Sequence, residues 1–130
     1  MISAVQRVGL AILVLLAAPA VRAQGGILSA DGTPVELAGR LSNPNGEGPA
    51  ILHLDAPVTV VAHVANVIEP ITSLERAFQV RAPSREIESL VAQAARAGDA
   101  VTIAGRLWWA GSAETLPSYV IDAVTVTPRR

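Results

Sequence analysis

The amino-acid sequence predicts an all-β domain with one helix. Five short runs alternate apolar and polar residues, as strands with one buried face do. Only one stretch has the 3.6-residue period of an amphipathic helix, and proline and glycine separate the runs. The expected order is β-β-β-α-β-β.

Residues 1–23 precede this domain and have the composition of an export signal. Their apolar run over 8–20 is shorter than the roughly 20 residues that a membrane-spanning helix needs. Val21 and Ala23 suit the −3 and −1 places of a signal-peptidase site. We therefore expect cleavage after Ala23, a single domain over 24–130, location in the periplasm and no stable membrane anchor after cleavage.

The first three predicted strands precede the helix. The first covers Val35–Leu41, and a turn rich in asparagine, proline and glycine follows over 43–49. The second covers Ala50–Ala62, where the even positions are apolar and form the expected buried face. The third covers Leu74–Arg81.

The predicted helix is about 13 residues long. Ser84 is a suitable N-cap, and Glu86 in the first turn and Arg96 near the end both complement the helix dipole. Gly98 lies just past the expected end. One helical face collects the apolar residues Ile87, Leu90, Val91 and Ala94.

Two strands follow the helix. The fourth covers 101–109, with Leu107 and Trp109 on its apolar face and Trp108 on its polar face. After a loop over 110–117, the fifth covers 118–126. Either of its faces could point inward: one holds Tyr119, Ile121 and Ala123, and the other holds Val120, Asp122, Val124 and Val126.

This order resembles the OB fold, a five-stranded Greek-key barrel with its helix between strands 3 and 4. Residues 35–41 and 101–107 match at five of seven positions. The first and fourth strands of an OB barrel are neighbours, so the resemblance implies that these two segments pair. It also implies that Gly39 and Gly105 lie where barrel strands bend sharply.

A narrower resemblance is to a family of small exported bacterial OB domains of unknown function. Residues 51–58 contain its leucine, aspartate and proline strand, and residues 98–105 contain its Gly-x-x-Val-x-Val-x-Gly strand with isoleucine at the second valine position. The family carries a histidine pair before the last strand, whereas this chain has Gly-Ser-Ala-Glu-Thr over 111–115. The resemblance implies no activity.

Composition excludes several chemistries. The chain has no cysteine and no lysine, because all ten of its basic residues are arginine, so disulfides, thiolate metal sites and Schiff-base chemistry are excluded. Without Arg7 and Arg22, eight arginines remain against eleven carboxylates, a formal charge of −3. Nucleic acid is therefore not the expected partner, since binding to phosphates needs a basic patch.

Catalytic motifs are missing from the sequence. It has no Gly-x-Ser-x-Gly elbow, no His-Glu-x-x-His helix and no glycine-rich phosphate loop. His53 and Asp55 share one strand face and could offer two metal ligands, which are too few for a site by themselves. We expect no enzyme activity, no catalytic residues, no metal site and no cofactor, with a metal-binding or hydrolytic protein using His53 and Asp55 as an alternative.

Aromatic residues gather around the loop between the last two strands. Trp108, Arg106 and Tyr119 are the main ligand-binding candidates, because OB folds place ligands near this loop and stack them on aromatic rings. His53 and Asp55 are further candidates on the second strand. The expected function is an exported, non-enzymatic OB binding module for a protein or a neutral glycan, with an oligonucleotide-binding OB domain as another alternative.

Overall fold

The computed structural model describes residues 21–22, 26–43, 49–63, 68–110 and 117–129. These residues form one sheet and one helix. The elements are β1 (Val21–Arg22), β2 (Ile27–Ser29), β3 (Asp31–Ser42), β4 (Ala50–Ala62), β5 (Ile71–Arg81), α2 (Arg85–Ala97), β6 (Ala100–Trp109) and β7 (Tyr119–Pro128).

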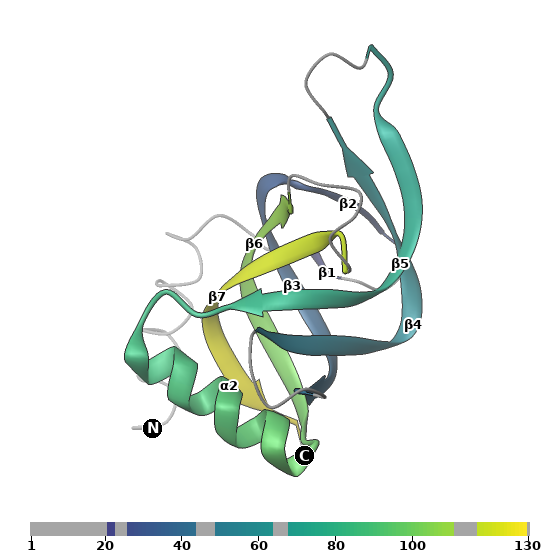
Figure 1. The fold of residues 1–130 in the computed structure, drawn as a ribbon. Helices are drawn as coiled ribbons and strands as arrows, with labels where there is room; N and C mark the ends of the chain where they lie inside the picture. The colour runs from purple at the N-terminus through teal and green to yellow at the C-terminus, as the bar shows by residue number, and fades with distance from the viewer. Residues whose placement is uncertain (1–20, 23–25, 44–48, 64–67, 111–116, 130) are drawn as a thin grey trace, which may run out of the picture.

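The five long strands close into a barrel. Neighbouring strands follow the order β3, β6, β7, β5 and β4, and β4 pairs back with β3. Every pair around this ring is antiparallel except β5 with β7, which is parallel. Figure 1 shows the strands wrapping around one core, with α2 across one end. This is the OB fold, and the predicted fold class is confirmed.

The helix follows the third of the five long strands, β5, and precedes the fourth, β6. When the three-residue β2 is counted as a strand of its own, the helix lies between the fourth and fifth strands instead of the third and fourth. The sequence analysis did not predict β2, which pairs in parallel with the second half of β4. This extra strand accounts for the difference in numbering.

The caps of α2 are those that the sequence predicts. The Ser84 hydroxyl accepts a hydrogen bond from the Ile87 amide at 3.3 Å. Gly98 ends the helix in the left-handed region at φ 67°, where a residue without a Cβ atom has no steric penalty. Val91 and Ala94 are buried, but Leu90, predicted to face the core, is 46% exposed. The apolar stripe that packs is therefore narrower than expected.

The two similar segments do pair. β3 and β6 run antiparallel, with Leu37 opposite Ile103 and Val35 opposite Gly105. The pairing of β6 with β7 shifts register between Ala104 and Gly105, which marks a local irregularity where the barrel strand bends. The prediction of a bend at Gly105 is confirmed.

The core fills the barrel with aliphatic side chains and one phenylalanine. On β4 the even positions Leu52, Leu54 and Val60 are buried as predicted. The largest fully buried side chains are Phe78, Leu28, Leu37, Leu41, Leu52, Ile103, Leu107, Ile121, Val35, Val60 and Val101. No helix within the described ranges is long and apolar enough to cross a membrane.

Candidate ligand-binding surface

The outer face of β6 carries Arg106 and Trp108. β6 alternates regularly at this end, so the buried Leu107 between them turns both side chains outward. Trp108 is 40% exposed, and Trp109 is partly buried against the core. The predicted division between the two tryptophans is confirmed.

Neighbouring strands extend this face. Asp122 on β7 lies opposite both Arg106 and Arg81, and Val120 lies opposite both Trp108 and Gln79. Directly opposite residues point to the same side of a sheet, so two rows of three side chains cross β6, β7 and β5. We call this surface the Trp108 face; it consists of Gln79, Arg81, Arg106, Trp108, Val120 and Asp122.

A bidentate ion pair lies at the centre of the Trp108 face. The Arg81 Nε and Nη2 atoms donate to the two carboxylate oxygens of Asp122, the second at 2.7 Å. This hydrogen bonding from Arg81 lowers the pKa of Asp122, burial opposes the shift, and a hydrogen bond from Trp108 is a lesser cause in the same direction. The side chain of Asp122 is 29% exposed and that of Arg81 is 63% exposed, so solvent still reaches the pair.

Trp108 and Arg106 also hold the turn that begins β3. The Arg106 Nη1 atom donates to the Gly32 carbonyl oxygen at 2.8 Å. Gly32 has φ 89°, and a Cβ atom there would lie 2.6 Å from the indole Cη2 atom of Trp108. The indole therefore packs flat against a glycine on one side, which fixes its orientation.

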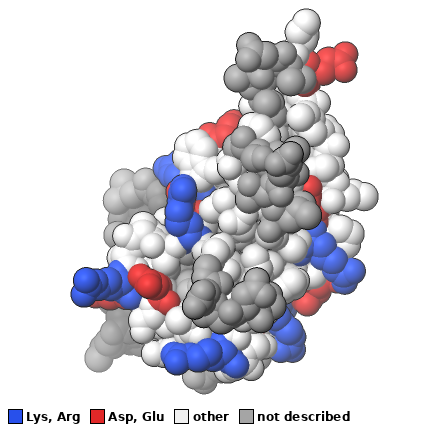
Figure 2. Space-filling model, in the orientation of Figure 1, with Lys and Arg blue, Asp and Glu red and all other residues white. Residues whose placement is uncertain are grey.

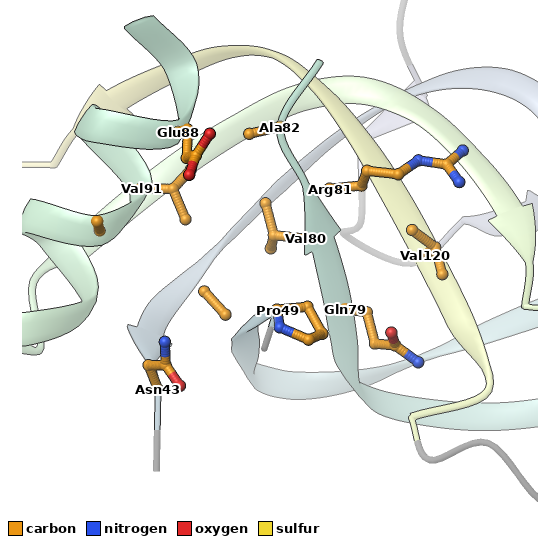
Figure 3. A pocket seen from close by; sticks show the side chains of 11 residues that line it. Asn43, Pro49, Gln79, Val80, Arg81, Ala82, Glu88, Val91 and Val120 are labelled. Carbon is orange, nitrogen blue, oxygen red and sulfur yellow. The ribbon is translucent and has the colours of Figure 1, made fainter. Parts of the chain in front are cut away.

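A pocket of about 530 Å³ adjoins the Trp108 face. Figure 3 shows Glu88 and Val91 of α2 on one side, Val80 of β5 on the other, and Asn43 and Pro49 at the edge. Gln79, Arg81 and Val120 line the pocket and also belong to the Trp108 face. The Asn43 Oδ1 atom is buried and has no hydrogen-bond partner among the described residues.

Tyr119 does not belong to this surface. It is 3% exposed, because the face of β7 that holds Tyr119, Ile121 and Ala123 is the one that points inward. The expectation that Tyr119 contacts a ligand is therefore wrong. Its ring contributes to the core of the barrel instead.

His53 and Asp55 lie on β4 and have separate partners. The His53 Nε2 atom is 2.8 Å from the Ser42 hydroxyl oxygen, and the Asp55 Oδ2 atom is 3.4 Å from Arg129 Nη1. Within the described part of the chain, no three histidine, aspartate or glutamate side chains gather as metal ligands. The structure therefore offers no geometric support for the metal or hydrolytic alternative.

The sequence analysis missed Arg81 and Gln79 as members of the surface. Both lie on β5, which is distant in sequence from Trp108 and reaches β7 only through three parallel register pairs. A parallel contact between strands this far apart leaves no local pattern in the sequence. The one available signal was that Arg81 ends a predicted strand on its polar face.

The charged side chains are dispersed on the side of the molecule that Figure 2 shows. Arginines and carboxylates alternate across this side, without one continuous basic patch among the atoms that are coloured there. The formal charge nevertheless understates the local positive charge. Arg40, Arg76 and Arg106 donate hydrogen bonds to main-chain carbonyl oxygens, which leave the charge of each guanidinium in place.

Comparisons with known proteins identify no family for this chain. No protein-family model matches it, and no curated protein matches it. One solved structure that it resembles is a small single-stranded DNA-binding protein from Streptomyces coelicolor. The match has 18% identity and a TM-score of 0.41, and it covers 76% of this chain and 94% of that chain.

The expectation that nucleic acid is not a partner is corrected. The solved structure named above binds single-stranded DNA according to its title, which contradicts an exclusion made from total charge alone. The physical reason is that total charge does not report how charge is distributed, as the guanidinium of Arg106 beside the exposed Trp108 shows. A likeness this distant says nothing about what the present chain binds, so the ligand is argued below from its own residues.

Proposed function

We propose that this protein is a non-enzymatic OB-fold binding module that holds a short single-stranded oligonucleotide on the Trp108 face. The observation that carries the proposal is an exposed indole whose neighbours in the two rows are Arg106 and Arg81. Bases stack on aromatic side chains, and guanidinium groups bind phosphates with planar pairs of hydrogen bonds. These are the two requirements for binding a single strand.

Each group on the face has a separate role in this proposal. A base stacks on the free side of the Trp108 indole, whose other side rests on Gly32. Arg106 takes a phosphate. Asp122 holds the Arg81 guanidinium in a fixed plane, which lowers the entropy lost when Arg81 also meets a phosphate.

The overall charge of the chain sets the expected strength of binding. Eleven carboxylates repel a polyanion at long range, so we expect weak binding that is sensitive to salt. Two phosphate contacts predict a slope of log K against log salt of about −1.4 for a single strand. Base stacking on one indole contributes about 1–3 kcal/mol, which is independent of salt to first order.

The cellular location is a second part of the proposal and rests on the sequence. We infer that residues 1–23 are an export signal, that residues 24–130 form the exported domain, and that this domain belongs with the small exported OB domains that it resembles. The barrel closes through the pairing of β3 with β4, which does not involve β1. Loss of Val21 and Arg22 by cleavage therefore leaves the ring intact.

Fluorescence anisotropy with a labelled single strand of about 12 nucleotides tests the ligand, because OB folds cover roughly 4–16 nucleotides each. We expect binding at low salt that Trp108→Ala weakens about tenfold, while Val124→Ala, an exposed apolar residue of β7, has no effect. Arg106→Gln should make the salt slope shallower by about 0.7. If neutral oligosaccharides bind through Trp108 and the oligonucleotide does not bind, the proposal is wrong.

A further inference from the structure

The second half of β4 and the first half of β5 leave the barrel as a projecting hairpin. Figure 1 shows the two strands extending together beyond the ring. Their register shifts between His53 and Val58, so the barrel part and the projecting part are separate regular stretches. The Arg76 side chain spans the shift, donating to the Leu54 carbonyl at 3.1 Å and the Asp55 carbonyl at 2.6 Å.

A third strand completes this projection. β2 pairs in parallel with β4, so Ile27 lies opposite Thr59, and Thr59 lies opposite Leu74 on β5. We call the three-stranded unit the arm; it consists of β2, residues 58–62 of β4 and residues 71–75 of β5. Arg76 fixes its direction relative to the barrel.

The arm exposes large aliphatic side chains to solvent. Leu74 is 71% exposed and Ile27 is 65% exposed, and both occupy the same row on one face of the arm. Ile71 is 44% exposed near the outer end. Aliphatic side chains gathered on a projecting unit indicate a surface that another molecule covers.

One backbone edge of the arm has no neighbour in the described structure. Residues 71–75 of β5 pair with β4 on one side, whereas β7 pairs with β5 only at residues 79–81. The other side of residues 71–75 therefore presents main-chain donors and acceptors. Proteins protect such edges with proline, lysine or inward charges, and the stretch Ile-Thr-Ser-Leu-Glu contains no proline or lysine.

We propose that this edge of β5 pairs antiparallel with the same edge of a second copy of the chain, about a two-fold axis at Leu74. The two arms then form one continuous six-stranded sheet. Leu74 lies opposite the partner's Leu74, and one row of the joined sheet runs from Ile27 through both leucines to the partner's Ile27. This arrangement is isologous, as in most homodimers.

The side chains of the edge favour this register. With Leu74 on the axis, Ser73 lies opposite the partner's Glu75, so a hydroxyl donor faces a carboxylate acceptor. The two already hydrogen bond within one chain at 3.0 Å, which shows that their side chains can reach each other on this face. A shift of the axis to Glu75 would place two carboxylates directly opposite, which is destabilising.

A second copy is the occupant that these features favour. A two-fold register needs a sequence that complements itself, and the leucine pair and the reciprocal serine–glutamate pairs satisfy that condition without any other chain. The paired stretch is only five residues long, so the contact is small and the dimer should depend on concentration.

A single-cysteine variant tests the register directly, because the chain contains no cysteine of its own. Residues directly opposite in antiparallel strands have Cα atoms about 4.5–5.5 Å apart, a separation that a disulfide spans. We expect Leu74→Cys to form a disulfide-linked dimer under mild oxidation. Val124→Cys, at 62% exposure on the barrel, is the matched control and should remain monomeric.

Light scattering of the unmodified protein completes the test. We expect the mass of two chains at about 100 μM and of one chain at about 1 μM, with Leu74→Arg monomeric throughout and equally stable to heat. A monomer at every concentration, or equal cross-linking of Leu74→Cys and Val124→Cys, would overturn the proposal. The result is independent of the oligonucleotide proposal, because the arm contains no residue of the Trp108 face.

Discussion

Gly105 packs directly against the main chain of Asp122. A Cβ atom at Gly105 would lie 2.8 Å from the carbonyl carbon of Asp122 and closer still to its oxygen. Gly39 has the same relationship with His53, at 2.8 Å from that carbonyl carbon. The two similar segments of the sequence thus place a glycine at equivalent close approaches of neighbouring barrel strands.

We predict that Gly105→Ala and Gly39→Ala each destabilise the fold by about 3 kcal/mol, because the added methyl group overlaps main-chain atoms that cannot move without breaking the ladder. Chemical denaturation of each variant measures this loss. Gly98→Ala is the control: nothing lies within 4 Å of its Cβ position, so only its backbone conformation opposes the change. A cost at Gly98 equal to the other two would contradict steric overlap as the cause.

The two neighbouring tryptophans should differ in their effect on stability. We expect Trp109→Ala to cost about 3 kcal/mol, since its ring packs against the core. Trp108→Ala should cost about 1 kcal/mol, because the ring is 40% exposed and its main contact is the Gly32 turn. Thermal unfolding of both variants provides the comparison, and a larger loss for Trp108→Ala would reverse the assignment of the two faces.

The Arg81–Asp122 ion pair should make stability depend on acid pH. The pair lowers the pKa of Asp122 in the folded state, so its contribution is complete above the ordinary carboxyl pKa and is lost as the pH falls through the lowered value. Solvent exposure limits it to about 1 kcal/mol or less. The stability difference between the unmodified protein and Asp122→Asn should therefore shrink between about pH 4 and pH 2; a difference that widens would contradict this assignment.

Removal of residues 1–23 should leave the barrel folded. The only described contact that this deletion removes from the sheet is β1, which has two register pairs with β3. Circular dichroism of residues 24–130 should show a β-rich spectrum, and its melting temperature should match that of the full chain within about 4 °C, the shift for roughly 1 kcal/mol. In an exporting host, mass spectrometry should find Gln24 at the N-terminus. Retention of residue 1 would contradict the export proposal.

Strand alternation predicted the parts of the fold that are regular. It placed Leu52 and Leu54 in the core and separated Trp108 from Trp109, because a side-chain period of two holds wherever a strand has no irregularity. Even parity also led us to expect Ala56 to be buried, but it is exposed. Its strand changes register between residues 53 and 58, and a bulge of this kind has no local sequence pattern here.

The candidate site was only half predictable for a related reason. Arg106 and Trp108 are adjacent in sequence and on one face, so their pairing followed from alternation. The faces of β7 were both partly apolar, so the burial of Tyr119 depended on tertiary packing. Arg81 entered the site through the closure of the barrel, which brings β5 beside β7.

Amide chemical-shift mapping of the isotope-labelled protein, titrated with a mixed-sequence single-stranded decamer, is the most direct test of the Trp108 face as an oligonucleotide site. We predict saturable shifts at the Trp108 indole N–H and at the amides of Gln79, Arg81 and Val120, with the arm residues Thr59 and Leu74 unchanged. Added salt should reverse the shifts, because two guanidinium–phosphate contacts supply part of the binding. An absence of shifts at saturating decamer, or shifts confined to residues outside the Trp108 face, would contradict the assignment.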